Sequence, residues 1–136
     1  LRGKAQHHLH RLGLGGRVVE RIDPELCLSA VGQGALALEV RASDEEARAL
    51  VAAVADPETL IAVTAERGVM AAAGGSCQVP LAAHAVRDGA DLLLRGFLAD
   101  PEGRWSRRRT ARGPWPSEVA AADALGRALG AALLVT

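Results

Sequence analysis

The hydrophobic period of the chain changes at residue 78, and this change constrains the fold more than any other feature of the sequence. Apolar side chains recur at helical spacing through residues 57–73, whereas residues 78–86, 92–99 and 104–112 alternate as strands do and are separated by turn sequences. An alanine- and leucine-rich helix follows over residues 116–134. The order of helix, three strands and helix predicts an α+β fold, in which a small three-stranded antiparallel sheet carries helices on one face.

Two helices in the middle of the chain have clear start signals. Asp44 precedes an alanine-rich run with two glutamates in its first turn, where the helix dipole favours negative charge. Asp56 is the predicted N-cap of the next helix, Pro57 takes its first position, and Gly74 is its C-terminal stop. The apolar face expected for this second helix consists of Leu60, Val63, Ala65, Val69, Met70 and Ala72.

The N-terminal part does not close a domain by itself. Residues 5–12 read as the end of a helix, while residues 17–22 and 35–40 read as strands that need partners from outside this sequence. The sequence begins at Leu1 rather than at a methionine, so we expect a fragment of a longer protein. These strand and helix segments are therefore expected to pair with parts of the protein outside this sequence.

Composition argues against several classes of function. Basic and acidic side chains number 16 each, so the net charge supports neither a nucleic-acid nor a membrane-surface role. Only three aromatic residues occur, and the apolar runs fall far short of the roughly 20 residues that span a bilayer. No secretory signal is visible, and two cysteines do not form a disulfide framework. We therefore expect a reducing, cytoplasmic location.

Two charged or metal-ligating clusters are better explained without a ligand. His7, His8 and His10 resemble metal ligands, but no downstream residue completes a set, so no metal site is expected. The second cluster comprises Arg104, Arg107, Arg108, Arg109 and Arg112. A solvated edge strand that uses charge against aggregation is the favoured interpretation, and an anion-binding patch is the alternative.

Cys77 lies in the sequence GGSCQVP, directly after a helix C-terminus. The helix dipole does not stabilise a thiolate there, and no nearby histidine or lysine would activate the thiol. Local reasoning leaves two readings open, a buried structural cysteine and a covalent attachment point, and favours the buried cysteine.

The block ERGVMAAAGGSCQVP, together with HRLGL, AVGQGA and ADPET, resembles the C-terminal half of the porphobilinogen deaminase (hydroxymethylbilane synthase) family over residues 9–134. The resemblance implies a transferase of tetrapyrrole (heme) biosynthesis that polymerises four porphobilinogen molecules into hydroxymethylbilane. The growing chain would be covalently linked to a dipyrromethane cofactor. The resemblance implies that this cofactor is attached to Cys77 through a thioether.

The resemblance also implies further site residues. Arg11 would contact the acidic groups of the pyrrole rings, and Gln33 and Gly34 would lie beside the cofactor. Glu66 and Arg67 would form an ion pair at a domain interface or contact substrate. Cys27 receives no role and is expected to be structural. The family's catalytic aspartate would lie N-terminal of this chain, so no catalytic residue is expected here and the missing N-terminal domains are the expected partner.

Three domain assignments follow from the resemblance. Residues 1–29 would be the tail of a second domain and residues 30–52 the return segment of a first domain, so that these strand and helix segments belong to two other α/β domains. Residues 57–136 would be the cofactor-anchoring C-terminal domain. The alternative function is a non-enzymatic α+β binding or interaction module in which Cys77 is buried.

Overall fold

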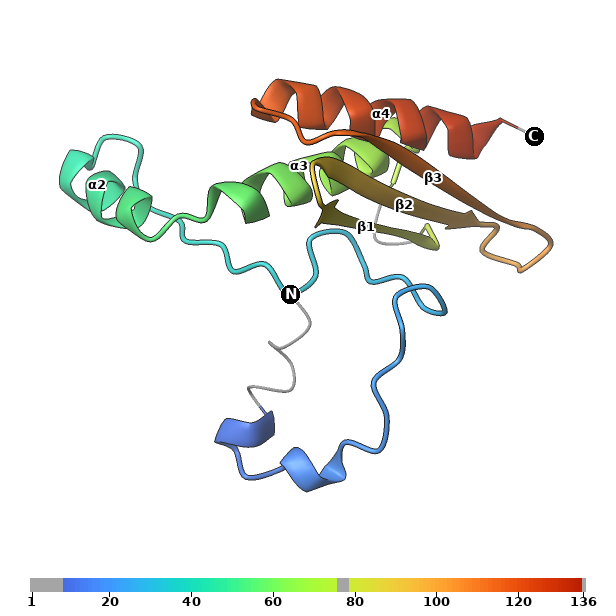
Figure 1. Cartoon of the computed structure of the whole chain (residues 1–136), viewed down its shortest axis with the longest axis horizontal. Helices are drawn as coiled ribbons and strands as arrows, with labels where there is room; N and C mark the ends of the chain where they lie inside the picture. The colour runs from blue at the N-terminus through green and yellow to red at the C-terminus, as the bar shows by residue number, and fades with distance from the viewer. Residues whose placement is uncertain (1–8, 76–78, 136) are drawn as a thin grey trace.

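A computed structural model describes residues 9–75 and 79–135 of the chain. Its centre is a three-stranded antiparallel sheet in the order β1-β2-β3, with two long helices on one face (Figure 1). The elements are η1 (Gly15–Arg17), α2 (Glu45–Ala53), α3 (Pro57–Ala72), β1 (Leu81–Asp88), β2 (Asp91–Ala99), β3 (Ser106–Pro114) and α4 (Val119–Leu134). This architecture confirms the α+β class and the meander expected from the change in period.

The pleat of the sheet divides apolar from charged side chains. Leu92, Leu94 and Leu98 of β2 face the helices and are buried, while Arg95 between them points to the opposite face. In the register, Leu94 pairs with Ala85 of β1 and with Ala111 of β3. The helix-facing side of the sheet is therefore lined by Leu and Ala, which suits a chain so poor in aromatic residues.

The two long helices cross at a contact made largely by glycine. A Cβ added at Gly126 would lie 2.1 Å from the carbonyl oxygen of Ala65, and one at Gly130 would lie 2.5 Å from that of Val69. Gly68 on α3 is equally crowded, because its Cβ would lie 2.6 Å from the Asp123 oxygen. The helix backbones thus touch directly, which lets both helices lie on a narrow sheet, with α3 over β1 and α4 over β2 and β3.

The helix boundaries follow the signals in the sequence. The Asp44 side chain accepts a hydrogen bond from the Ala47 N–H (2.9 Å), and Asp56 accepts one from the Glu58 N–H (3.2 Å). At the other end of α3, Gly74 has a φ of 68° and the Gly75 N–H donates to the Met70 carbonyl at 2.9 Å. This is the helix stop that glycine provides without strain.

The apolar face of α3 was predicted only in part. Val63, Ala65 and Val69 are buried, but Leu60 is 53% exposed and Met70 is 37% exposed. Ile61 and Ala62 are buried in their place. The buried face is shifted because α3 packs against both α4 and β1, and periodicity alone does not say where those partners lie.

The strands predicted at residues 17–22 and 35–40 are wrong for this chain. Residues 9–11 are helical, but from residue 18 to residue 43 the described chain runs as turns and extended coil. Val19 is fully exposed and Leu36 is 79% exposed. A strand needs a hydrogen-bonded neighbour, and β1, β2 and β3 pair only with one another.

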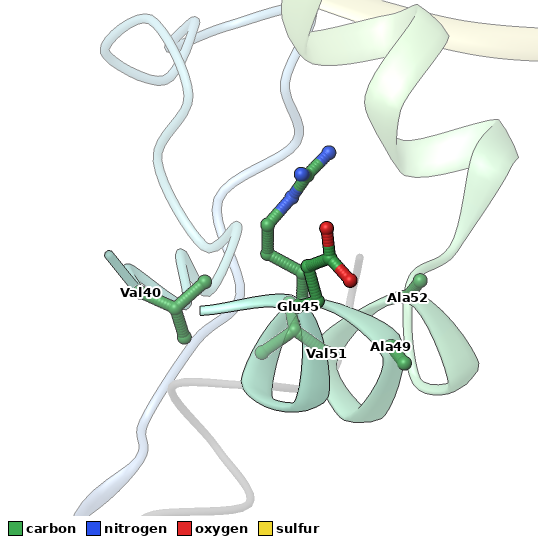
Figure 2. A pocket seen from close by; sticks show the side chains of 6 residues that line it. Val40, Glu45, Ala49, Val51 and Ala52 are labelled. Carbon is green, nitrogen blue, oxygen red and sulfur yellow. The ribbon is translucent and has the colours of Figure 1, made fainter. Parts of the chain in front are cut away.

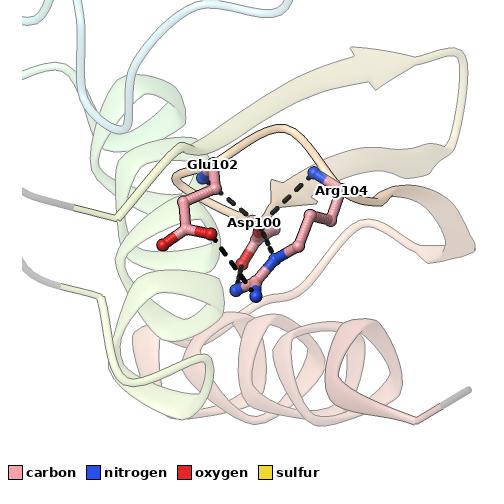
Figure 3. Close-up of polar contacts among 3 residues, drawn as sticks. All are labelled: Asp100, Glu102 and Arg104. Carbon is pink, nitrogen blue, oxygen red and sulfur yellow. Dashed lines mark hydrogen bonds and ion pairs between the residues drawn. The ribbon is translucent and has the colours of Figure 1, made fainter.

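The loop between β2 and β3 is organised by one carboxylate (Figure 3). Asp100 accepts hydrogen bonds from the backbone N–H groups of Glu102 and Arg104, and the Arg104 guanidinium binds it through Nε at 2.7 Å and Nη2 at 3.0 Å. The Arg104 hydrogen bond holds the pKa of Asp100 below its ordinary value. The turn is therefore fixed by charge-assisted bonds rather than by apolar packing.

Candidate functional site

Cys77, with Ser76 and Gln78, lies outside the described residues, so its burial and its role stay predictions. The described neighbours fix the elements between which it stands. Gly75 closes the C-terminal end of α3, and Val79 packs against the core just before β1. The predicted attachment point therefore belongs to the connection between α3 and β1.

Gln33 and Gly34 form an exposed turn. Gly32 and Gly34 both have positive φ angles, of 69° and 88°, and the Ala35 N–H donates to the Gly32 carbonyl at 3.1 Å. The Gln33 side-chain oxygen accepts from the Ala30 N–H at 3.0 Å, so this oxygen closes its own turn. The turn thus keeps its shape through local bonds while its outer side stays open to solvent.

Glu66 joins this turn to the C-terminal sheet. Its Oε2 accepts from the Gly32 N–H at 2.7 Å, and its Oε1 accepts from the Ala85 N–H of the edge strand β1 at 2.9 Å. The side chain is buried, with His84 Nδ1 3.8 Å from Oε1. Burial raises the pKa of Glu66 above its ordinary value, and the two backbone donors oppose that shift.

Glu66 and Arg67 do not pair with each other among the described residues. The sequence predicted for them an ion pair at a domain interface or a substrate contact. The Glu66 oxygens bind backbone N–H groups and lie near His84, Arg67 is exposed, and the substrate contact stays a prediction. The partners of Glu66 lie 34 and 19 residues away along the chain, so no local sequence pattern predicts these contacts. A glutamate among the buried residues of a helix face is the one signal that could have marked it.

The predicted arginine contact is not assembled near these residues. Arg11 is exposed and belongs to the short helical turn at the start of the described chain, which Figure 1 shows well away from the sheet and α3. The structure thus links the Gln33 turn to the α3–β1 region through Glu66, but it does not bring Arg11 to them.

A shallow hollow of about 560 Å³ lies elsewhere, beside α2 (Figure 2). It is lined by Val40, Glu45, Arg48, Ala49, Val51 and Ala52. None of the predicted site residues contributes to it. Since α2 buries none of its side chains, this hollow is an uncovered helix face lined by apolar side chains together with Glu45 and Arg48.

Most arginines of β3 and of the loop before it are engaged with the protein. Arg107 Nη1 donates to the Leu133 and Leu134 carbonyls at the end of α4, at 3.1 and 3.0 Å. Arg112 forms ion pairs with Asp88 and Asp91 at 2.9 and 2.7 Å, and Arg104 pairs with Asp100. Because these arginines already bind groups of the protein, the contacts argue against an anion-binding patch along β3.

The second cysteine and the histidine cluster add no further site among the described residues. Cys27 is an exposed free thiol, so within this chain it has no packing role. His7 and His8 lie outside the description, and residues 9–75 and 79–135 hold no group of three or more metal-ligating side chains. Over the same residues, no helix is long and apolar enough to cross a membrane.

Comparison with known proteins identifies two family matches in chain order. Residues 5–49 match the family described as porphobilinogen deaminase, dipyromethane cofactor binding domain, and residues 60–135 match porphobilinogen deaminase, C-terminal domain. The second match begins in the first turn of α3, at residue 60, and contains the rest of that helix, the three strands and α4.

Curated relatives carry the same name. The porphobilinogen deaminase of Sorangium cellulosum is 50% identical over 125 residues, which cover 92% of this chain and 42% of that protein. Those of Bordetella parapertussis and Roseiflexus sp. are each 45% identical and are covered over 38% and 42% of their lengths. The chain thus spans about two fifths of these relatives, and it belongs to the porphobilinogen deaminase family.

Proposed function

We propose that this chain is the C-terminal part of a hydroxymethylbilane synthase, which polymerises four porphobilinogen molecules on a dipyrromethane primer held by Cys77. The observation that carries the proposal is the pair of family matches on either side of the α2–α3 junction, at residues 5–49 and 60–135. The domain assignments at residues 1–29, 30–52 and 57–136 belong to the same proposal.

The proposal assigns Arg11 to the acidic groups of the pyrrole ligand. Arg11 is exposed, and a guanidinium pairs bidentately with acetate and propionate groups of the kind that pyrrole rings of this substrate carry. Glu66 lies beside the Gln33 turn, but both of its oxygens already accept backbone N–H groups. Its negative charge is therefore partly neutralised within the protein rather than presented to an anionic ligand.

The proposal gives Cys77, Arg11 and the Gln33–Gly34 turn separate roles. When bound, the dipyrromethane supplies the primer that porphobilinogen units extend. Cys77 holds it through a thioether, which resists hydrolysis and keeps the primer in place while product is released. Arg11 receives carboxylate groups, and the exposed Gln33–Gly34 backbone lies at the crossing between domains.

The activity requires more than this chain. We expect the chain by itself to release no hydroxymethylbilane, because the family's catalytic aspartate would lie N-terminal of Leu1. The missing N-terminal domains are therefore its partner in this proposal. A cytoplasmic location also belongs to it, because thioether formation at Cys77 needs a reduced thiol.

The decisive test is the intact mass of the full-length protein. We expect an adduct of two pyrrole units that gives the Ehrlich colour reaction of pyrroles, and we expect both to disappear in Cys77→Ala. The matched control is Cys27→Ala, which changes the exposed second thiol and should keep the adduct.

An active full-length protein of unmodified mass would refute the attachment at Cys77. A full-length protein without adduct or activity would favour the alternative, a non-enzymatic α+β interaction module. That alternative draws on the hydrophobic core that α3, the sheet and α4 form among themselves.

A further inference from the structure

Residues 23–34 run beside β1 and meet the C-terminal elements at two places (Figure 1). The first is the buried Glu66, whose two oxygens bind the Gly32 N–H on one side and the Ala85 N–H of β1 on the other. One carboxylate therefore bridges the Gln33 turn and an otherwise unpaired edge of the sheet.

The second place is formed by two arginines of the sheet. Arg95 makes an ion pair with the Glu25 carboxylate, and Arg108 donates to the Leu26 carbonyl at 3.0 Å as well as to that of Glu25. Arg108 is held over the ring of Phe97 at 5.6 Å, which orients its guanidinium. Both arginines belong to the sheet face that the helices leave open.

Apolar packing contributes little to the placement of this segment. Val31 is its one member that packs against the core among the described residues, and Leu26 is 74% exposed. The position of the Gly32–Gly34 turn relative to α3 and β1 therefore depends on polar contacts, above all on Glu66.

We propose that Glu66, Arg95 and Arg108 are positioning residues that hold residues 23–34 against the C-terminal sheet and so place the Gln33 turn for the reaction. The part that concerns the reaction rests on the proposed function. The part that concerns the segment rests on the contacts alone.

Hydrogen exchange in the full-length protein tests the segment without reference to activity. In Glu66→Gln, the amide group presents a donor where an acceptor is needed, so one of the two bonds is lost. We expect exchange of the amides of residues 30–35 to rise about tenfold, the change that loss of one bond to a charged group produces in a local equilibrium.

Matched controls separate this effect from a general change of charge. Glu58→Gln makes the same change on the same helix at an exposed side chain. Arg109→Gln is the control for arginine substitutions, because among the described residues this arginine of β3 bonds the neighbouring Arg108 carbonyl and not residues 23–34. Both should leave exchange in residues 23–34 unchanged. Equal exchange in Glu66→Gln and Glu58→Gln would overturn the proposal.

A second pair of variants covers the case in which Glu66→Gln does not fold. Arg95→Gln and Arg108→Gln change side chains on the open sheet face, outside the hydrophobic core. They should raise exchange in residues 23–27, and wild-type exchange there would overturn the proposal on its own.

Kinetics on the cofactor-loaded fraction test the link to the reaction. We expect kcat/KM for porphobilinogen to fall about tenfold in Arg95→Gln at temperatures well below its Tm, with no change in Arg109→Gln. Faster exchange with unchanged kcat/KM would overturn the positioning role. A wild-type protein lacking both adduct and activity would overturn the proposed function, and the exchange result alone would then decide whether these residues hold the segment.

Discussion

At the scale of single residues, two buried or half-buried carboxylates organise parts of the chain that periodicity does not describe. Glu66 binds backbone groups from two distant segments, and Asp100 binds those of its own turn. The sequence places Asp100 in a turn because Pro101 and Gly103 follow it. It cannot place Glu66, since its function depends on where residues 32 and 85 come to lie.

Asp100 makes the stability of the protein depend on pH in the acid range. Its pKa lies below the ordinary value of 3.8 because of the Arg104 hydrogen bond, so the ionised form stabilises the fold above that value. The contribution is lost as the pH falls through the lowered pKa. We expect Asp100→Asn to be less stable than wild type at pH 7 and the difference to shrink below about pH 4, measured by urea unfolding at several pH values.

Glu102→Gln is the matched control for Asp100→Asn, since it removes a charge from an exposed side chain of the same loop. Its effect on stability should be small at every pH. A stability difference for Asp100→Asn that stayed constant from pH 7 to pH 3 would contradict the assignment.

At the scale of elements, the sequence predicted those elements that find their partners within the chain. The caps at Asp44 and Asp56 and the stop at Gly74 mark α2 and α3 correctly, and alternation marks the three strands. The strands expected at residues 17–22 and 35–40 do not form, because alternation indicates which side chains a strand would bury but does not supply the neighbour it must bond. The predicted site residues share this limit. The Gln33 turn is held by Glu66 through the Gly32 N–H, whereas the short helical turn that carries Arg11 lies well away from the sheet (Figure 1).

The crossing of α3 and α4 yields a prediction at the same scale. Gly126→Ala places a methyl group 2.1 Å from the Ala65 oxygen, which forces the two helices apart. We expect a loss of about 2 kcal/mol in the free energy of unfolding, even though alanine is the better helix former. Chemical denaturation of wild type and variant measures it.

Gly113→Ala on β3 provides the comparison, since an added Cβ there meets nothing within 4 Å. Its effect should stay within about 0.5 kcal/mol. Comparable losses in the two variants would show that the helix contact does not account for the effect, because Gly→Ala by itself lowers the entropy of the unfolded chain and stabilises the fold.

At the scale of the whole molecule, the described chain divides into a packed half and an open half. Every residue of the hydrophobic core cluster lies between residues 61 and 133, whereas Leu36, Leu38 and Leu50 are exposed by 79%, 62% and 68%. Polar contacts rather than core packing tie the open half to the sheet. The two halves should therefore differ in local stability.

Limited digestion with trypsin measures that difference. We expect cleavage after Arg21 and Arg41, which lie in extended coil, well before cleavage after Arg87 and Arg127, which lie in β1 and α4. All four side chains are exposed, so accessibility of the side chain alone predicts equal rates. A time course followed by mass spectrometry distinguishes the two outcomes, and equal rates would contradict the division.

The helix stop at Gly74 and Gly75 has a consequence for where the neighbouring connection begins. A side chain at position 74 would be strained at a φ of 68°, and a Cβ at position 75 would lie 2.7 Å from the Met70 side chain. Main-chain geometry at these two residues therefore fixes where the connection to β1 begins. Under the proposed function, the backbone of two glycines would fix the start of the segment that anchors the growing tetrapyrrole.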